Sequence, residues 1–214
     1  MYQAVIFDLD GTLLNTIYDL AHAGNYALVE LGLPIHDYEK YKQMLGYGKK
    51  RLIEKILPKG MELCNTIANQ LFDSYYMRHM LDDTIIYQGI NELLKALHDK
   101  KIKLAVLTNK PYIFAKEMID HYFPQMFDYV QGVEDDGITK PNPFNLLKIM
   151  NKFEVIPNEV LYVGDTDVDV LTGHNAKVDT AGVLWGFRSK SELEVSNPTY
   201  LVENTDELET IIFK

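Results

Sequence analysis

From residue 89 onward, helical and strand-like patterns alternate along the sequence, and this alternation is what most restricts the fold. Strands that alternate with helices form right-handed βαβ units around a parallel sheet. The pattern predicts, in order, a helix over 90–99, a strand over 103–108, a helix over 111–121, a short strand near 128–131, a helix over 143–151, a strand over 160–165, a further helix, and a strand over 181–185. We therefore expect an α/β fold built on a parallel sheet.

The first residues predict one more strand, which most simply joins the same sheet. The run AVIF at 4–7 contains β-branched and aromatic residues that suit a strand covered on both faces. Between this strand and residue 85 the patterns are helical only, over 16–31, 38–45, 49–56 and 61–81, with turn sequences between them. The chain is therefore expected to divide into an α/β core, residues 1–15 and 85–214, and an inserted all-α cap, residues 16–84.

Composition excludes several classes of protein. The 214 residues include 21 Lys and Arg against 31 Asp and Glu, a net charge of −10, which argues against a nucleic-acid backbone or an anionic membrane as partner. No apolar run reaches the 18 or so residues of a membrane span, and no basic, apolar leader precedes the first strand. The single cysteine, Cys64, cannot form an internal disulfide. We expect a cytoplasmic monomer or small homo-oligomer.

Polar side chains stand where three of the predicted strands end. Asp8 ends the first strand, Thr108 and Asn109 end the strand that begins at 103, and Asp165 ends the strand that begins at 160. Parallel strands bring their carboxyl ends to one edge of a sheet, where ligands bind. These side chains are therefore expected to converge. Asp10 should join them, because residues two apart on an extended chain point the same way.

The convergence of several carboxylates implies a cation. Asp8, Asp10 and Asp165 would repel one another in one cleft unless a positive charge were present. An all-oxygen set of ligands suits hard ions, and Mg²⁺ is the natural choice beside a phosphate. The segment DTDVD at 165–169 does not match a calcium loop, which needs Gly at its sixth position and Glu at its twelfth, where this chain has Val170 and Ala176.

Lys140 and the segment after Thr108 add groups that bind anions. Lys140 precedes a helix start bounded by prolines, and could direct its ammonium group into the same cleft. Thr108 offers a hydroxyl, and the helix expected after Lys110 would offer backbone N–H groups. A carboxylate nucleophile, a second carboxylate, a hard cation and a lysine together suit phosphoryl transfer.

On these residues the chain resembles the haloacid dehalogenase superfamily. DLDGT at 8–12, TN at 108–109, Lys140 and GDTDVD at 164–169 match the four motifs of that family in order and spacing. The resemblance implies a Rossmann-like parallel sheet with an inserted helical cap, and a magnesium-dependent hydrolase that acts on a small phosphorylated metabolite.

The resemblance also implies two catalytic roles. Asp8 would be the nucleophile that forms an aspartyl phosphate, and Asp10 would protonate the leaving oxygen and then deprotonate the attacking water. Dehalogenases of the superfamily lack the second aspartate, because a halide needs no proton. The presence of Asp10 therefore favours phosphate chemistry.

Binding roles follow from the same resemblance. Mg²⁺ would be held by Asp8, the main-chain carbonyl of Asp10 and Asp165, and Asp169 would brace this set. The phosphoryl oxygens would be bound by Thr108, Asn109 and Lys140. The role of Asp167 stays open: it is either a surface or helix-capping residue, or it lies in an outer position near the metal.

Smaller similarities point to the phosphoglycolate phosphatase-like branch. They are TNKP at 108–111, KPNP at 140–143, GYG at 46–48 and LWGFRSKSEL at 184–193. A small phosphomonoester such as phosphoglycolate is therefore the expected substrate. A β-phosphoglucomutase-like transferase, a nucleotidase and a pyrophosphatase remain alternatives, and a binding module without activity is disfavoured because it would not need Asp8, Asp10, Lys140 and Asp165 together.

The cap carries a candidate for substrate selection. Gly46 and Gly48 precede Lys49, Lys50 and Arg51. In one interpretation the glycines let the backbone approach a ligand, and a cation meets a second anionic group such as a carboxylate. In the other, the glycines form a turn and the cations are solvated. Gly46 and Arg51 are kept as candidate substrate-binding residues.

Four aromatic residues are assigned to packing rather than to substrate binding. Large aromatic side chains contribute much of the apolar area of cores and are usually placed there. They are Tyr75, Tyr76, Trp185 and Phe187.

Overall fold

The computed structural model describes residues 1–214 and contains a six-stranded sheet with all neighbouring strands parallel. The strand order is β5-β4-β1-β6-β7-β8. The strands are β1 (Ala4–Phe7), β4 (Lys103–Pro111), β5 (Tyr129–Val133), β6 (Val160–Gly164), β7 (Asp179–Val183) and β8 (Tyr200–Val202). The predicted α/β fold with a parallel, Rossmann-like sheet is confirmed.

The side chains of β1 alternate between the two faces of the sheet, as a strand buried on both sides requires. Val5 and Phe7 belong to the larger apolar core, with α5 (Ile90–Asp99), α6 (Tyr112–Tyr122) and α10 (Thr205–Phe213). Ala4 and Ile6 belong to the smaller core on the other face, with α7 (Phe144–Phe153) and the C-terminal end of α8 (Asp167–Ala176). Two helical layers therefore cover the sheet.

The register of the central strands aligns their carboxyl ends. Phe7 lies opposite Val106 of β4 on one side and opposite Val163 of β6 on the other. The backbone N–H of Asp8 donates to the carbonyl of Val163 at 2.8 Å. The polar residues that follow β1, the end of β4 and β6 are thereby brought to one edge of the sheet.

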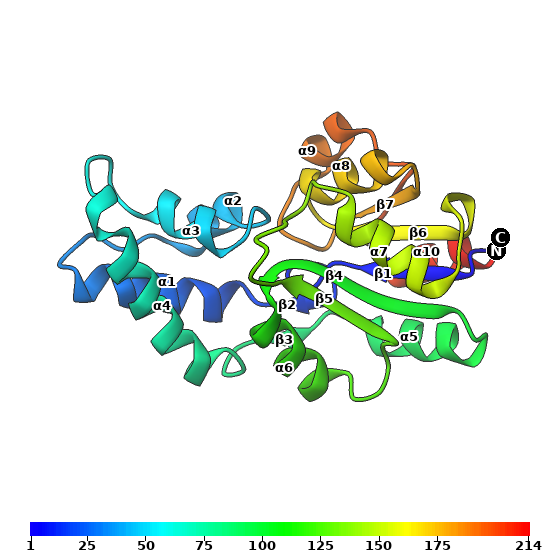
Figure 1. Ribbon diagram of the computed structural model, residues 1–214, viewed down its shortest axis with the longest axis horizontal. Coiled ribbons are helices and arrows are strands. Elements are labelled where there is room, and N and C mark those ends of the chain that lie inside the picture. Colours follow the sequence, from blue (N-terminus) through cyan, green and yellow to red (C-terminus); the bar gives the residue numbers. More distant parts are fainter.

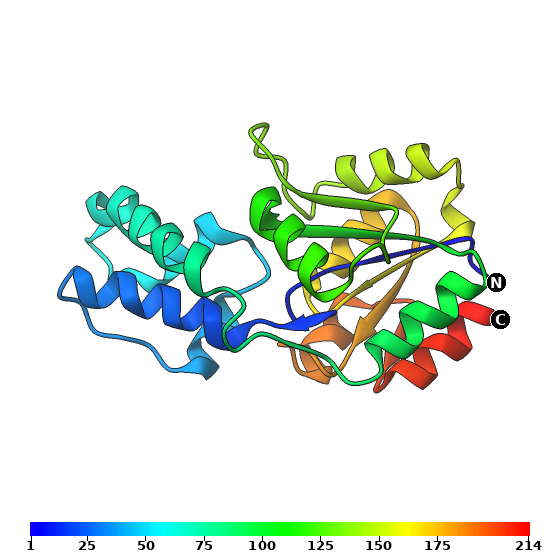
Figure 2. The ribbon, with the colours of Figure 1, turned by 90° about the horizontal axis from the view of Figure 1, so that it is seen from below.

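Four helices and a 3₁₀ turn form a separate lobe beyond that edge (Figures 1 and 2). They are α1 (Ile17–Glu30), α2 (Tyr38–Met44), α3 (Lys49–Ile56), the 3₁₀ turn η1 (Glu62–Cys64) and α4 (Asn65–His79). The lobe is at the left of Figure 1, whereas the two termini lie together at the opposite end. The prediction of a single helix over 61–81 was wrong for its first turn, because residues 62–64 form a 3₁₀ turn before α4 begins.

Two chain segments join the lobes. β2 (Leu14–Asn15) and β3 (Ile85–Ile86) pair in an antiparallel ribbon. The buried carboxylate of Asp19 in α1 accepts hydrogen bonds from the backbone N–H of Asp83 at 3.0 Å and the hydroxyl of Thr84 at 2.7 Å, so it ties the second segment to the start of the cap. We propose that this ribbon is the border between a core of residues 1–15 and 85–214 and a cap of residues 16–84.

The C-terminal part of the fold contains elements that the sequence pattern did not indicate. They are the edge strand β8, α9 (Lys190–Ser196) and α10. β4 also continues to Pro111, so that α6 begins at Tyr112, one residue later than predicted. No helix of the structure combines the length and the apolar character that crossing a bilayer requires.

Candidate active site

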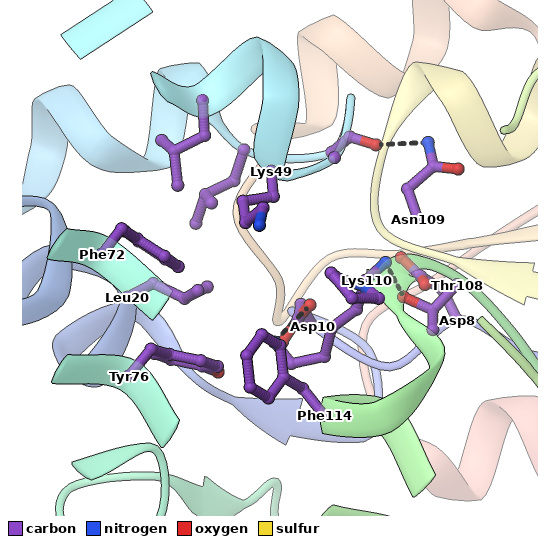
Figure 3. Close-up of a pocket in the computed structure, with 15 residues that line it drawn as sticks. Asp8, Asp10, Leu20, Lys49, Phe72, Tyr76, Thr108, Asn109, Lys110 and Phe114 are labelled. Atoms are coloured by element: carbon purple, nitrogen blue, oxygen red, sulfur yellow. Dashed lines mark hydrogen bonds and ion pairs between the residues drawn. The ribbon is translucent and has the colours of Figure 1, made fainter. Parts of the chain in front are cut away.

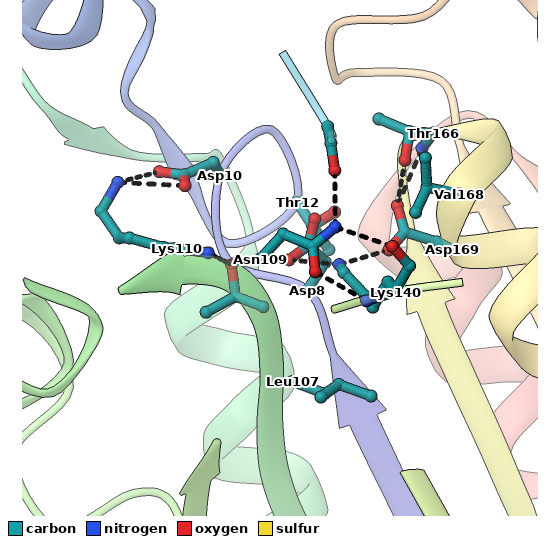
Figure 4. A network of polar contacts seen from close by, with 12 residues as sticks. Asp8, Asp10, Thr12, Leu107, Asn109, Lys110, Lys140, Thr166, Val168 and Asp169 are labelled. Carbon is teal, nitrogen blue, oxygen red and sulfur yellow. Dashed lines mark hydrogen bonds and ion pairs between the residues drawn. The ribbon is translucent and has the colours of Figure 1, made fainter. Parts of the chain in front are cut away.

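A buried lysine joins two of the carboxylates at the edge of the sheet. The Nζ of Lys140 lies 2.9 Å from Oδ1 of Asp8 and 2.6 Å from Oδ1 of Asp169 (Figure 4). All three side chains are buried. The backbone N–H of Lys140 donates to the side-chain oxygen of Asn109 at 2.8 Å, so the end of β4 helps to place the lysine.

Asp165 is held from several directions. Its two oxygens accept hydrogen bonds from the hydroxyl of Thr12 at 3.0 Å and from the backbone N–H of Phe187 at 2.8 Å. Gly11, with φ +87°, passes so close that a Cβ there would lie 2.3 Å from Oδ2 of Asp165. A Cβ at Gly186 would lie 2.2 Å from the Cβ of Asp165. The glycine of DLDGT is therefore needed to give Asp165 room.

The donor set fits a hard divalent cation. Asp8, Asp165 and Asp169 each offer one carboxylate oxygen, and these oxygens lie within 4.8 Å of one another. Oδ1 of Asp8 is buried and, although Lys140 is close, has no donor in hydrogen-bonding geometry. Burial raises the pKa of Asp8 to about 7, with Lys140 opposing and Asp169 adding to the shift. Burial, followed by the charges of Asp169 and Asp8, raises the pKa of Asp165 well above its usual range. A cation would relieve both effects.

Asp169 already has protein donors on both oxygens. Oδ1 accepts from Lys140 and from the hydroxyl of Tyr162 at 3.0 Å. Oδ2 accepts from the backbone N–H of Thr166 at 3.0 Å and from its hydroxyl at 2.7 Å, which is a capping arrangement at the start of α8. The structure therefore places Asp169 behind Lys140, where it orients the ammonium group.

The carboxylate of Asp10 turns away from the group around Asp8 (Figure 4). Its oxygens lie 2.8 and 3.0 Å from the Nζ of Lys110, whose side chain is 3% exposed. The ammonium group also lies 4.9 Å from the ring centroid of Tyr76 in the cap. Burial lowers the pKa of Lys110, but the charge of Asp10, the contact with Tyr76 and the hydrogen bonds to both together outweigh burial, and the pKa is raised above its usual value. Lys110 was not among the site residues predicted from the sequence, although a lysine at the end of an apolar strand was a signal.

A small cavity of about 50 Å³ lies between the two lobes (Figure 3). The core lines it with Asp8, Asp10, Thr108, Asn109 and Lys110. The remaining wall is mostly apolar, and its large side chains are Leu20, Leu45, Leu52, Phe72, Tyr76 and Phe114. Tyr76 is buried, in agreement with its assigned packing role, and borders this cavity as well.

A comparison of the sequence with family models agrees with this arrangement. The model described as "Haloacid dehalogenase-like hydrolase" matches residues 5–183. The chain belongs to the haloacid dehalogenase-like hydrolase family. The resemblance stated from the four motifs is thereby confirmed.

Individual relatives of this family member carry a more specific name. The "Phosphoglycolate phosphatase" of Vibrio parahaemolyticus is 31% identical over 98% of the chain and 96% of the relative, and that of Haemophilus influenzae is 32% identical over 99% and 98%. A solved structure assigned as a phosphoglycolate phosphatase from Lactobacillus delbrueckii has a TM-score of 0.90 at 30% identity, covering 99% of this chain and 98% of that one. The expectation of an enzyme, a phosphoric monoester hydrolase similar to phosphoglycolate phosphatases, is confirmed.

The cap loop of this haloacid dehalogenase-like hydrolase needs glycine at two positions. Gly46 and Gly48 have φ of +101° and +83°. A Cβ at Gly46 would lie 3.1 Å from Cγ2 of Thr166, and one at Gly48 would lie 3.0 Å from the carbonyl oxygen of Asn109. The side-chain amide of Asn109 donates to the carbonyl of Gly46 at 3.0 Å. The glycines therefore form a turn and also let the cap approach the core closely.

Two further side chains of the core reach the same loop. Arg188 donates hydrogen bonds to the carbonyls of Lys42 at 2.6 Å and Leu45 at 2.7 Å, at the C-terminal end of α2. The hydroxyl of Tyr47 donates to the carboxylate of Asp167. Asp167 thus bridges core and cap. This contact was not foreseen from the sequence, which left Asp167 between capping and an outer metal role.

Of the three cations after Gly48, the structure brings one into the cavity. Lys49 lines it, and its Nζ lies 2.7 Å from Oδ2 of Asp73 on α4. Arg51 pairs with Glu54 at 3.0 Å, is 67% exposed and does not line the cavity. Lys50 does not line it either. Among the two candidates kept from the sequence, Gly46 lies at the cavity and Arg51 does not.

Proposed function

We propose that this protein is a magnesium-dependent phosphatase that hydrolyses a small phosphomonoester with a carboxylate, such as 2-phosphoglycolate, through an aspartyl phosphate. One observation carries the proposal: a small cavity between the lobes has Asp8 in its wall together with two lysines, Lys49 and Lys110. The names of the relatives support it. A cytoplasmic location, the lack of nucleic-acid and membrane partners, and a monomeric or small homo-oligomeric state stay predictions.

The size of the cavity favours a small substrate. A volume of about 50 Å³ has room for about three to five waters at 10–15 Å³ each. A phosphomonoester with a two-carbon acid needs far less additional space than a nucleoside monophosphate, which would require the cap to move away. The two lysines favour a substrate with a second negative charge over a neutral ester.

In the first step, a carboxylate oxygen of Asp8 attacks phosphorus. The bond between phosphorus and the alkoxy oxygen of the substrate breaks as the bond to Asp8 forms, and Asp10 gives its proton to that oxygen. Lys140 and the hydroxyl of Thr108 are the core groups proposed to bind the phosphoryl oxygens. Asn109, whose side chain already bonds Lys140 and Gly46, is proposed to hold these partners in place.

In the second step, Asp10 accepts a proton from water, whose oxygen bonds to phosphorus. The bond between phosphorus and Asp8 breaks, phosphate leaves and the Asp8 carboxylate is restored. The apolar wall of the cap keeps bulk water from the aspartyl phosphate during this cycle.

The residues proposed to hold Mg²⁺ are Asp8, Asp165 and the main-chain carbonyl of Asp10. When bound, the ion supplies positive charge that reduces the repulsion between the phosphoryl group and the surrounding carboxylates. Asp169 is proposed to act on this set through Lys140, because each of its two oxygens already accepts two hydrogen bonds.

A substrate panel tests the proposal. The purified protein is assayed with and without Mg²⁺ on 2-phosphoglycolate, p-nitrophenyl phosphate, β-glucose 1-phosphate, pyrophosphate and nucleoside monophosphates. We expect the highest kcat/KM for 2-phosphoglycolate, and only with Mg²⁺. Conversion of β-glucose 1-phosphate to its 6-phosphate isomer would favour the transferase instead, and no turnover of any compound would favour a binding module.

A further inference from the structure

Asp10 is held where it cannot carry out its proposed proton transfers. Both of its oxygens contact Lys110, and its carboxylate points away from the Asp8, Lys140 and Asp169 group (Figure 4). A proton donor must come within hydrogen-bonding distance of the leaving oxygen, which is bonded to the phosphorus that Asp8 attacks. Asp10 must therefore leave Lys110 during the reaction.

Lys110 cannot easily be left without a partner. Its side chain is 3% exposed. Its ammonium group contacts the carboxylate of Asp10 and, more weakly, the ring of Tyr76. Removing one partner of a buried ion pair leaves an uncompensated charge, which is strongly unfavourable. Asp10 will therefore be released mainly when another anion takes its place at Lys110.

The cavity can deliver such an anion. Lys110, Asp10 and Asp8 all line it, so a molecule with its phosphate at Asp8 can direct a second group toward Lys110 (Figure 3). Lys49 also lines the cavity, but its partner is Asp73, a cap residue outside the cavity lining. An anion that displaced Asp73 would release no group needed for proton transfer.

We propose that Lys110 is a specificity-determining residue that binds the carboxylate of the substrate and, by this exchange, releases Asp10, which takes up a proton from solvent and turns to the leaving oxygen. The inference rests on the proposed function, a phosphatase for phosphomonoesters that carry a carboxylate. Recognition and proton transfer are coupled, because one ammonium group is shared between the substrate and Asp10. A phosphomonoester of similar size that lacks a carboxylate leaves Asp10 paired with Lys110. Its leaving group then departs as an alkoxide, without a proton.

The test compares 2-phosphoglycolate with methyl phosphate, which lacks the carboxylate but also needs a proton on its leaving oxygen. In the unaltered protein we expect kcat/KM for 2-phosphoglycolate to be at least about a hundredfold higher. Lys110→Met should lower it about tenfold to a hundredfold, the range of a charge-assisted contact, while methyl phosphate hydrolysis becomes faster because Asp10 is free. A merely structural role would lower both substrates together and would overturn the inference.

Two further variants sharpen the comparison. Lys110→Arg keeps a cation and should retain part of the preference for 2-phosphoglycolate. Lys116→Met makes the same substitution on the exposed lysine of α6, which pairs with Asp120 at the surface, and should leave both substrates unchanged. If Lys110→Arg loses the preference as completely as Lys110→Met, exchange at a cation is not its source.

A crystal structure of the unaltered protein with glycolate gives a readout that does not depend on the folding of a variant. We expect the glycolate carboxylate at the Nζ of Lys110 and Asp10 turned toward Asp8. A glycolate carboxylate at Lys49, with the Asp10 to Lys110 pair intact, would overturn the inference. If the unaltered protein does not prefer 2-phosphoglycolate, the proposed function fails. If it does and Lys110→Met keeps that preference, only the role of Lys110 fails.

Discussion

Arg188 of the core donates a hydrogen bond of 2.7 Å to the carbonyl of Leu45 in the cap, and a second one, of 2.6 Å, to the carbonyl of Lys42. The guanidinium group is buried between the lobes and lies at the C-terminal end of α2, where the helix dipole favours a cation. This contact holds the cap loop against the core beside the cavity.

Arg188→Met should weaken cap closure. Hydrogen bonds from a charged group contribute about 1.5–3 kcal/mol, so we expect kcat/KM for the best substrate to fall about tenfold or more. Limited proteolysis should cut the linkers near residues 15 and 85 faster than in the unaltered protein. Arg78→Met, on the exposed side of α4, is the matched control and should change neither. Unchanged kinetics in Arg188→Met would contradict a role in closure.

Asp8→Asn should abolish turnover while the protein still folds, because an amide of nearly equal volume replaces the nucleophile. It also removes one of the buried, mutually repelling carboxylates, so the midpoint of thermal unfolding without metal should not fall. Borohydride added during turnover of the unaltered protein should reduce the aspartyl phosphate and convert Asp8 to homoserine, as mass spectrometry of its peptide would show. Release of phosphate without any reduced Asp8 would indicate direct attack by water.

Asp10→Asn should slow alkyl esters more than p-nitrophenyl phosphate. Positioned proton transfer contributes about 10²–10⁴-fold, and p-nitrophenolate leaves without a proton. Rapid-quench measurement of the first step separates proton donation from the later activation of water. Equal losses for the two leaving groups in that step would show that Asp10 has a different role.

Mg²⁺ should raise the midpoint of thermal unfolding, and the increase should grow with pH. The pKa of Asp8 is raised from 3.8 to about 7, so the folded state without metal holds a proton that the unfolded chain has lost. Stability therefore falls as pH rises from about 4 to 7, and a cation removes this penalty. Differential scanning fluorimetry at pH 5 and pH 8 checks the direction, and Asp165→Asn should reduce the shift. A larger shift at pH 5 would contradict it.

Gly46→Ala should impair the cap loop more than an equivalent change elsewhere. Its φ of +101° is costly for any other residue, by roughly 1–2 kcal/mol, and the new methyl group would contact Thr166. Gly60→Ala is a matched control, because Gly60 has φ of +89° but nothing within 4 Å of an added Cβ. We expect similar losses of stability, but a lower kcat/KM in Gly46→Ala alone. Equal kcat/KM values in Gly46→Ala and Gly60→Ala would show that the conformation of this loop does not affect the reaction.

Local patterns in the sequence were enough to place the catalytic edge of the sheet. Asp8, Thr108 and Asp165 each follow an apolar run of residues in a strand, and parallel strands in register must end at the same edge. The gathering of Asp8, Lys140 and Asp165 there required no knowledge of packing beyond the βαβ pattern. The C-terminal strand β8 was missed because its three residues are too few to show an alternation.

The sequence by itself determined the fold class, the family and the residues at the strand ends, because all of these depend on short-range periodicity and on motifs read in order. Only the tertiary structure decided which side chains meet across the two lobes. The pairing of Lys110 with Asp10, the reach of Arg188 to α2 and the position of Lys49 but not Arg51 in the cavity depend on how the cap packs on the core. That packing joins segments far apart in the chain, and no local pattern specifies the partner of a buried charge.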